Sequence, residues 1–404
     1  MLPEPVREQL RRIVGRDSVI DSHNDLRIFE RDGSIEGALP DAVVLASSTE
    51  HVAEVIKIAA EHKIPVVPRG AGTGLSGGAV TIHGGIALQV TRMRRILEID
   101  TVAHTAMVEP GVVNQELSLV AAQHGLFYAP DPSSQKACTI GGNAAENSGG
   151  PHCLYYGVTT NHVLGMEVVL ADGSVHWVSG DAPDRVGLDL CGVLVGSEGT
   201  LCAITKIKVR LLRVPPSVAT MLAAFPTIDT ASQAVSAVIG HGIVPAALEM
   251  MDNVTVGAVE AHYKAGYPTD AGAVLLVEVD GTEESTRELI SSIGRILSDN
   301  HGYAMREAQT PPNVSCCGRA ARAPSALSGG SSRTTTCMTA SFLAPGCRRS
   351  CRRWARSAST TSSRSPTSST PATATCIPTS FSTCATRASC TRSSPRARRC
   401  FAPW

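Results

Sequence analysis

Up to residue 212 the chain alternates short apolar runs with polar, glycine-rich connections, a pattern typical of mixed helices and strands. The apolar run 42–46 predicts a strand, and the following Ser47-Ser-Thr-Glu50 matches a capping box that opens a helix over 51–62. The turn Ala171-Asp-Gly173 predicts a hairpin between its two flanking apolar runs. The other expected elements are helices over 3–14 and 113–124, and strands over 64–67, 85–90, 163–170, 174–178 and 201–212, with one more ending at 106–111.

A second segment begins after the break Val214-Pro-Pro216. Beyond it, strands over 218–225, 246–251 and 273–279 alternate with helices over 229–240 and 283–300. This alternation predicts a small layered α+β domain. We therefore expect a first domain over 1–215, with its core over about 36–215, and a smaller domain over 216–310.

The chain from Pro311 onward has a different composition. Only seven of its residues are Val, Leu, Ile or Phe, and none is Asp, Glu or Lys. It holds 14 of the 36 basic residues, so the preceding part carries 22 basic against 36 acidic side chains. Such a segment cannot bury enough apolar surface to offset chain entropy, and 311–404 is predicted to be a disordered tail.

Charge and cysteine usage narrow the function classes. The acidic body has no basic stripe for nucleic acid. Its four cysteines, Cys138, Cys153, Cys191 and Cys202, form no close pair and fit a reducing compartment. The first residues lack the apolar core of a signal peptide, and no stretch has the length and apolarity of a membrane helix. We expect a cytoplasmic protein.

Two glycine-rich loops carry the candidate chemistry. The first spans 65–79 and the second spans 130–150, each next to a strand-like run. Dense glycine lets a backbone approach a ligand closely, so that its N–H groups converge on a phosphate. Two such loops in one domain predict an extended anionic cofactor held at several points, and a flavin dinucleotide fits best.

The tail composition is what G/C-rich coding DNA gives when it is read out of register. A permissible codon choice for 369–378, read one base earlier, gives His-Ala-Gly-Asp-Gly-Asn-Leu-His-Pro. In the same register 313–327 contains Trp-Ala-Gly-Arg-Lys, and 334–342 gives Tyr-Tyr-Met-His-Asp-Gly-Val-Val. Three sensible segments in one shift predict a frameshift near 309–313.

The body, over about 10–305, resembles the FAD-linked oxidases of the vanillyl-alcohol oxidase type. The resemblance is to the branch that contains the D component of bacterial glycolate oxidase, D-lactate dehydrogenase and D-2-hydroxyglutarate dehydrogenase. It implies an α+β fold: a two-part FAD-binding domain, then a cap domain, incomplete here. The motifs that carry it are Val67-Pro-Arg-Gly-Ala-Gly-Thr-Gly-Leu-Ser-Gly-Gly78, Pro130-Asp-Pro-Ser-Ser134, Thr139-Ile-Gly-Gly-Asn143, Tyr156-Gly-Val-Thr159 and Gly196-Ser-Glu-Gly-Thr200.

The resemblance also implies which residues bind FAD. The first loop would lie on the phosphates, with backbone amides as the main donors. Because no His occupies it, we expect noncovalent FAD. The implied cofactor-binding residues are Pro68, Arg69, Gly70, Ala71, Gly72, Thr73, Gly74, Leu75, Ser76, Pro130, Asp131, Ser133, Thr139, Gly142, Asn143, Asn147, Gly149, Gly150, Tyr156, Gly157, Glu198, Gly199 and Ile204.

The reaction implied by the family is hydride removal from the α-carbon of a 2-hydroxy acid, of the glycolate or D-lactate type, to the flavin. An Arg would clamp the substrate carboxylate, and a divalent metal held by the two His of the hidden segment would polarise its hydroxyl. Both lie in the predicted out-of-frame part, so no catalytic residue or metal ligand is assigned and activity is expected to be impaired. The electron acceptor would be a quinone, a cytochrome or an iron–sulfur subunit, which could hold the protein peripherally at the inner membrane.

Several residues have plainer interpretations. His152 and His162 are expected in loops or supporting the site rather than on a metal, and Cys138 and Cys153 as small buried thiols. Glu249 faces either the active site or solvent. The tail cysteines lack zinc-site spacing, and the Arg cluster over 347–353 is more simply a translation artefact than a nucleic-acid or lipid site.

Two rival functions remain open at this point. One is an aldonolactone or alcohol oxidase of the same flavin superfamily, against which the hidden two-His segment argues. The other is a noncatalytic FAD-binding subunit. A flavin spectrum that a D-2-hydroxy acid bleaches would distinguish an enzyme from a binding module.

Overall fold

The computed structural model describes residues 2–180 and 187–307. All of them fall within one unit of the chain, Met1–Cys351. The expected disorder of 311–404 concerns residues outside this description. Helices and sheets are mixed throughout, as the sequence predicted, and they form two lobes of a first domain followed by a second domain.

The first lobe is built on a sheet with strand order β1-β2-β4-β3, in which β2, β4 and β3 run parallel and β1 pairs antiparallel with β2. Its helices pack their apolar faces together, with Leu10 of the first helix and Val55 of the third fully buried in one core. The elements of this lobe are α1 (Glu4–Val14), η1 (Arg16–Ser18), β1 (Val19–Ile20), α2 (His23–Leu26), η2 (Arg27–Phe29), β2 (Ala42–Leu45), α3 (Thr49–Glu61), β3 (Val66–Arg69) and β4 (Ile86–Gln89).

The start of α3 differs from the expected capping box. Helix α3 begins at Thr49, and its N-cap is Ser48 rather than Ser47. Ser48 has extended backbone angles, and its Oγ accepts a hydrogen bond from the amide of His51 at 3.3 Å. The third helical position is therefore His51 rather than Glu50, and the predicted Ser47–Glu50 capping box is wrong by one residue. Glu50 instead hydrogen-bonds the side chain of Ser48, which lowers the pKa of the Glu50 carboxyl.

This cap predicts a stability difference between two adjacent serines. Ser48→Ala removes the acceptor for the His51 amide and should lower the free energy of unfolding by about 1 kcal/mol. Ser47→Ala is the matched control and should change it by less than about 0.5 kcal/mol, as surface substitutions usually do. Urea unfolding measures both, and an equal loss from the two variants would contradict the assigned cap.

The second lobe is built on a five-stranded antiparallel sheet with order β5-β6-β10-β8-β9, next to a two-stranded pair, β11-β7. The expected hairpin is confirmed, because β8 pairs antiparallel with β9 across Gly173, whose φ is +78°. The elements are β5 (Ile96–Asp100), β6 (Thr105–Val108), α4 (Asn114–Ala122), β7 (Leu126–Phe127), α5 (Ile140–Glu146), α6 (Cys153–Tyr156), η3 (Thr159–Asn161), β8 (Val163–Val169), β9 (Val175–Ser179), α7 (Leu190–Leu194), β10 (Ala203–Arg210) and β11 (Leu212–Arg213).

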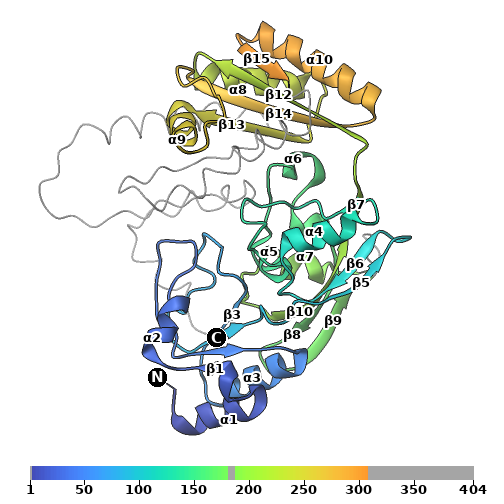
Figure 1. The fold of residues 1–404 in the computed structure, drawn as a ribbon. Coiled ribbons are helices and arrows are strands. Elements are labelled where there is room, and N and C mark those ends of the chain that lie inside the picture. Colours follow the sequence, from blue (N-terminus) through green and yellow to red (C-terminus); the bar gives the residue numbers. More distant parts are fainter. Residues whose placement is uncertain (1, 181–186, 308–404) are drawn as a thin grey trace, which may run out of the picture. The chain divides into compact units, whose positions relative to one another are not determined.

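The second domain is an antiparallel sheet of order β13-β14-β12-β15. Helices α8 and α10 cover one face, where Val235 and Ile293 pack with Val277, and α9 covers the other (Figure 1). The elements are β12 (Ser217–Phe225), α8 (Ile228–Gly240), β13 (Ala247–Asp252), α9 (Asn253–Tyr263), β14 (Ala273–Gly281), α10 (Glu283–Asp299) and β15 (Tyr303–Glu307). The layered α+β class is confirmed, and the exact boundary at 215/216 stays a prediction.

None of the helices in the described ranges is both long and apolar enough to cross a lipid bilayer.

Candidate functional site

The first glycine loop leaves the carboxyl end of β3 and is braced from within by Arg69. This residue is 6% exposed, and its guanidinium donates to the carbonyl oxygens of Ala79 at 2.9 Å and Arg31 at 2.6 Å. It also lies 5.8 Å from the ring centroid of Phe29. Burial lowers the pKa of this guanidinium. The Arg69 side chain is thus engaged with the backbone that surrounds the loop, so we assign it to shaping the loop rather than to pairing with a phosphate.

The backbone of this loop supplies the donors that an anionic cofactor needs. Within the described parts of the chain, the amides of 72–76 donate no hydrogen bond to protein acceptors. Gly72 has a φ of +68°, a conformation that L side chains rarely adopt. A run of free amides in a turn of this kind forms an anion-binding concavity. The residues present therefore fit a diphosphate.

The second glycine loop is not a loop throughout, contrary to the expectation from its composition. From Ile140 it becomes the helix α5, because the Oγ1 of Thr139 accepts the Gly142 amide at 3.2 Å. Glycine is needed at 141 for packing: a Cβ there would lie 2.5 Å from that of Pro110. The glycines of this motif thus serve close helix packing as well as cofactor access.

The two loops meet directly. A Cβ on Gly70 would lie only 2.5 Å from Oγ1 of Thr139, so the absence of a side chain at 70 is what allows the approach. The carbonyl of Gly70 is fixed in turn by Nε2 of Gln89 at 3.0 Å. One loop from each lobe of the first domain thus contributes to the same place.

The turn Gly196–Thr200 is the third motif at this place. The amide of Gly196 donates to the carbonyl of Ala144 at 2.8 Å, and that of Glu198 donates to Ala145 at 2.9 Å. A Cβ on Gly199 would lie 3.3 Å from Cδ of Pro68, in the first loop. Gly196, Glu198 and Gly199 all have φ between +53° and +82°, so the turn is tight enough to fit between α5 and the first loop.

Glu146 is a site residue that sequence reasoning missed. Its Oε2 accepts a hydrogen bond from Oγ of Ser76 at 2.9 Å, which joins the end of α5 to the first loop. Burial raises its pKa, and the nearby Glu198 and Asp32 add to the rise against the opposing Ser76 hydrogen bond. The signal that could have found it is helical spacing. Glu146 lies three residues after Asn143 on helix α5, and this helix was not expected from the sequence.

Glu146 predicts a pH effect on anion binding. Since its folded pKa lies above the ordinary 4.5, ionisation becomes costly as the pH rises from about 4.5 through the raised value. The Glu146→Gln variant keeps an acceptor for Ser76 and removes a negative charge beside the phosphate loop. It should bind FAD a few-fold more tightly than the parent at pH 7, with a flatter pH dependence between 4.5 and 7. Flavin fluorescence titration measures this, and weaker binding by the variant would contradict it.

The other predicted cofactor residues fall into three groups. Buried residues with side chains at the junction include Thr139 and Asn143; Asn143 is 1% exposed, and its Nδ2 has no partner among the described residues. Residues engaged within the protein include Asn147, whose Oδ1 accepts the Thr160 amide at 2.9 Å, and Pro130, whose carbonyl accepts from Asn114 at 2.8 Å. The remaining positions are the loop residues 70–76, Ser133, Gly142, Gly149, Gly150, Gly157 and Ile204, whose contacts with FAD stay predictions.

Asp131, at the start of the second loop, is held by His152. Nδ1 of His152 lies 2.8 Å from Oδ2 of Asp131, and its Nε2 lies 2.7 Å from Oε1 of Glu278 on β14. Burial lowers the pKa of His152, but the hydrogen bonds and charges of the two carboxylates outweigh this and raise it to about 10. Nearby, the hydroxyl of Tyr156 donates to Oδ2 of Asp280. His152 therefore supports the loop, one of the roles expected of it.

The remaining candidates are resolved more simply. His162 is buried, with Nε2 2.9 Å from the carbonyl of Tyr156, and burial lowers its pKa. Burial raises the pKa of the Cys138 thiol, whereas Cys153 is only half-buried, so the buried-thiol expectation holds for Cys138 alone. Glu249 is 4% exposed, so its solvent-facing alternative is wrong. No cluster of metal-ligating side chains occurs among the described residues.

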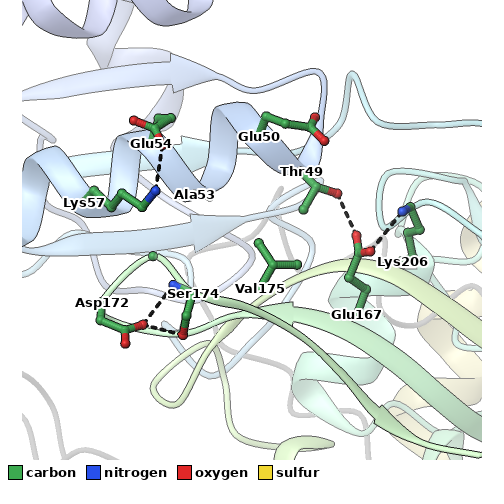
Figure 2. Close-up of a pocket in the computed structure, with 11 residues that line it drawn as sticks. Thr49, Glu50, Ala53, Glu54, Lys57, Glu167, Asp172, Ser174, Val175 and Lys206 are labelled. Carbon is green, nitrogen blue, oxygen red and sulfur yellow. Dashed lines mark hydrogen bonds and ion pairs between the residues drawn. The ribbon is translucent and has the colours of Figure 1, made fainter.

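A groove of about 660 Å³ lies between α3 and the β8–β9 hairpin (Figure 2). Oε1 of Glu167 accepts from Thr49 at 2.7 Å, and its Oε2 pairs with Lys206 at 2.9 Å, so the two lobes are tied together here. None of the predicted cofactor residues lines this groove. It is a charged joint in the first domain rather than the candidate cofactor site.

Comparison with known proteins agrees with this geometry. Residues 40–179 match a family described as FAD binding domain, and 214–336 match the family described as FAD linked oxidases, C-terminal domain. The second match overlaps the first part of the predicted out-of-frame tail, so the position of the frame change stays a prediction.

Curated relatives give the same picture. Glycolate oxidase subunit GlcD of Escherichia coli (strain K12) is 44% identical over 290 residues, 71% of this chain and 58% of that protein. GlcD of Bacillus subtilis (strain 168) is 41% identical over 312 residues, covering 77% and 66%. D-lactate dehydrogenase of Anaerostipes hadrus is 34% identical over 298 residues, covering 72% and 61%. The chain thus spans less than two thirds of each relative.

Solved structures share the fold at low identity. p-Cresol methylhydroxylase with substrate bound superposes with a TM-score of 0.69 at 19% identity, covering 80% of this chain and 71% of that one. Alkyldihydroxyacetonephosphate synthase gives 0.68 at 20% identity, covering 81% and 64%. These likenesses concern architecture alone.

Proposed function

Because the chain belongs to the FAD-linked oxidases, we propose that its first domain binds FAD noncovalently and that the protein is descended from a 2-hydroxy-acid dehydrogenase. The substrate would be of the glycolate or D-lactate type, as the names of its relatives suggest. The reaction would be removal of a hydride from the substrate α-carbon.

The observation that supports this most is the meeting of three motifs from two lobes. Gly70 touches Thr139, the turn at Gly199 touches Pro68, and Ser76 binds Glu146. In this proposal the amides of 72–76 hold the diphosphate, and the unpartnered Nδ2 of Asn143 donates to the cofactor. FAD would supply the hydride acceptor, while the protein supplies position and field.

The described residues bind and orient, but they do not complete a reaction centre. All 12 His lie at or before His301, so the tail as translated contains none. The carboxylate clamp and the two-His metal site proposed for this family would lie in the segment that a shifted frame encodes. We therefore propose that the chain as translated binds FAD and is impaired in catalysis.

This gap favours one second candidate, a noncatalytic FAD-binding subunit. The described residues hold the cofactor motifs without a cluster of metal-ligating side chains. The aldonolactone or alcohol oxidase alternative has no comparable observation in its favour.

Electron transfer to a partner is also part of the proposal. GlcD is by name a subunit of glycolate oxidase, which suggests that this protein works with other chains. Among the described residues, no group of His, Cys, Asp and Glu side chains could hold a metal ion, and Cys138, Cys191 and Cys202 are buried. We propose that a separate iron–sulfur subunit, a quinone or a cytochrome accepts the electrons, and that any membrane association is peripheral.

The test is a purified chain titrated with FAD and then with substrate. A bound flavin spectrum is expected. Flavin bleached by D-lactate or glycolate, with reduction of dichlorophenolindophenol above free FAD, would show an intact enzyme. Bound flavin without bleaching would show a binding module. A colourless protein that ignores added FAD would overturn the proposal altogether.

A further inference from the structure

Along β14, one face of the second-domain sheet changes from apolar to acidic side chains. Val274 and Leu276 point to the face that α9 covers and are buried there. Because side chains alternate along a strand, Glu278 and Asp280 continue on that same face. Two carboxylates thus take the place of two apolar side chains, beyond the part that α9 covers.

Residues of the first domain meet these two carboxylates. His152 pairs with Glu278 at 2.7 Å, and Tyr156 donates to Asp280. Leu154, between them in the chain, packs against the apolar core of the second domain. Thr220 on β12 donates to the other oxygen of Glu278 at 3.3 Å. The segment 152–156 is therefore a docking element with two polar contacts and one apolar contact.

The same imidazole holds the cofactor loop. Its Nδ1 lies 2.8 Å from Asp131, and its backbone amide donates to the other carboxylate oxygen at 3.4 Å. Gly150 must lack a side chain here, since a Cβ would lie 2.3 Å from Asp131 Oδ1. One ring thus connects the start of the second loop to a strand of the other domain, 126 residues further on.

We propose that His152 is a positioning residue for the flavin reaction, which fixes the spacing between the cofactor loop at Asp131 and strand β14 at Glu278. The inference rests on the proposed function, because the loop at 131 is assigned to FAD there. It goes beyond that function because it connects the second domain to the cofactor loop through the side chain of His152. A substitution at Glu278 should then change the affinity for FAD, although Glu278 is not itself among the assigned cofactor residues.

The charge of the ring is central to this role. His152 faces Asp131 from the loop, Glu278 from β14 and Tyr156 from its own segment. Asp280 pairs with Tyr156, and Glu249 is buried on neighbouring β13. A neutral ring could donate to only one of its two carboxylates. The pKa of His152, raised to about 10, keeps it charged at neutral pH. The stabilisation of the folded state by this charged contact is complete below about pH 6.5 and is lost as the pH rises through about 10.

Double-variant FAD binding tests the proposal on the full chain. We expect Glu278→Gln to raise the FAD dissociation constant about 5- to 10-fold, and His152→Gln about 10-fold or more. The two together should bind no more weakly than His152→Gln alone, because both act through one contact. His124→Gln, an exposed histidine on the same domain, is the matched control and should bind like the parent.

Two results would overturn the proposal. One is an unchanged dissociation constant for Glu278→Gln beside a weakened His152→Gln, which would confine the role of His152 to its own loop. The other is multiplication of the two effects in the double variant. A pH series adds a readout that simple packing would not move: FAD binding by the parent should weaken as the pH rises through about 10, and that of His152→Gln should not.

Failure of the proposed function would look different. If the parent binds no FAD at all, urea unfolding of the apo chain decides the contact by itself. The midpoint shifts of His152→Gln and Glu278→Gln should then be non-additive. Additive shifts would overturn the contact, whatever the cofactor does.

Discussion

A chain whose reading frame is restored by one added base near codons 309–313 will oxidise a 2-hydroxy acid, whereas the chain as translated will not exceed free FAD. The restored segment contains His-Ala-Gly-Asp-Gly-Asn-Leu-His and Trp-Ala-Gly-Arg-Lys, which offer metal ligands and cationic groups that the translated tail replaces with Ser, Thr, Pro and Arg. Positioned proton transfer alone contributes about 10²- to 10⁴-fold. A gain of at least about 100-fold in dichlorophenolindophenol reduction with D-lactate or glycolate is the expected result.

The control for this experiment is three added bases at the same codons. They lengthen the gene but leave the downstream register as it is, so this variant should stay inactive. Substantial turnover by the chain as translated would contradict the prediction, and so would an inactive frame-restored chain that binds FAD. Resequencing the gene over codons 305–315 gives an independent answer, since an intact frame there refutes the frameshift.

The Gly70→Val variant will lose most of its affinity for FAD. A Cβ at position 70 would lie 2.5 Å from Oγ1 of Thr139, a buried residue that also caps α5. The added side chain must therefore push the two glycine loops apart. Overpacking of this kind costs about 1–3 kcal/mol. If FAD binding bears this cost, the FAD dissociation constant rises roughly 5- to 150-fold.

A glycine in open space is the matched control for this variant. Gly257 lies in α9 and has no heavy atom within 4 Å of a built Cβ, apart from its own helix and chain neighbours. Gly257→Ala should leave FAD binding unchanged and raise the free energy of unfolding by about 0.5–1 kcal/mol, because alanine favours a helix. Parent-like FAD binding by Gly70→Val, measured by fluorescence titration, would show that the loops do not meet as described.

Elements with strong local patterning were predictable. The strand over 273–279 and the helix over 283–300 were found within two residues of β14 and α10, because apolar spacing and caps agreed with the final packing. Helix α9 was missed, since its sequence is rich in Val and Thr and includes Gly257, which are poor helix formers. It forms because Asp252 caps it and its buried Val256 and Val259 pack on the sheet.

The site was predictable as motifs but not as a network. The glycine-rich segments gave the cofactor loops, since glycine composition is a local signal. Helix α5 was hidden inside one of those segments, and with it the position of Glu146 against Ser76. The contact between His152 and Glu278 joins residues 126 positions apart, which no local pattern encodes.

The bridging imidazole also limits how such proteins can exchange parts. A second domain grafted from another flavoprotein would place its own residue opposite His152. If that residue were apolar, the charged imidazole would lose its carboxylate partner. Chimaeras that fold and bind FAD should therefore take residues 131–156 and strand β14 from the same parent protein, because the two segments contact each other through these side chains.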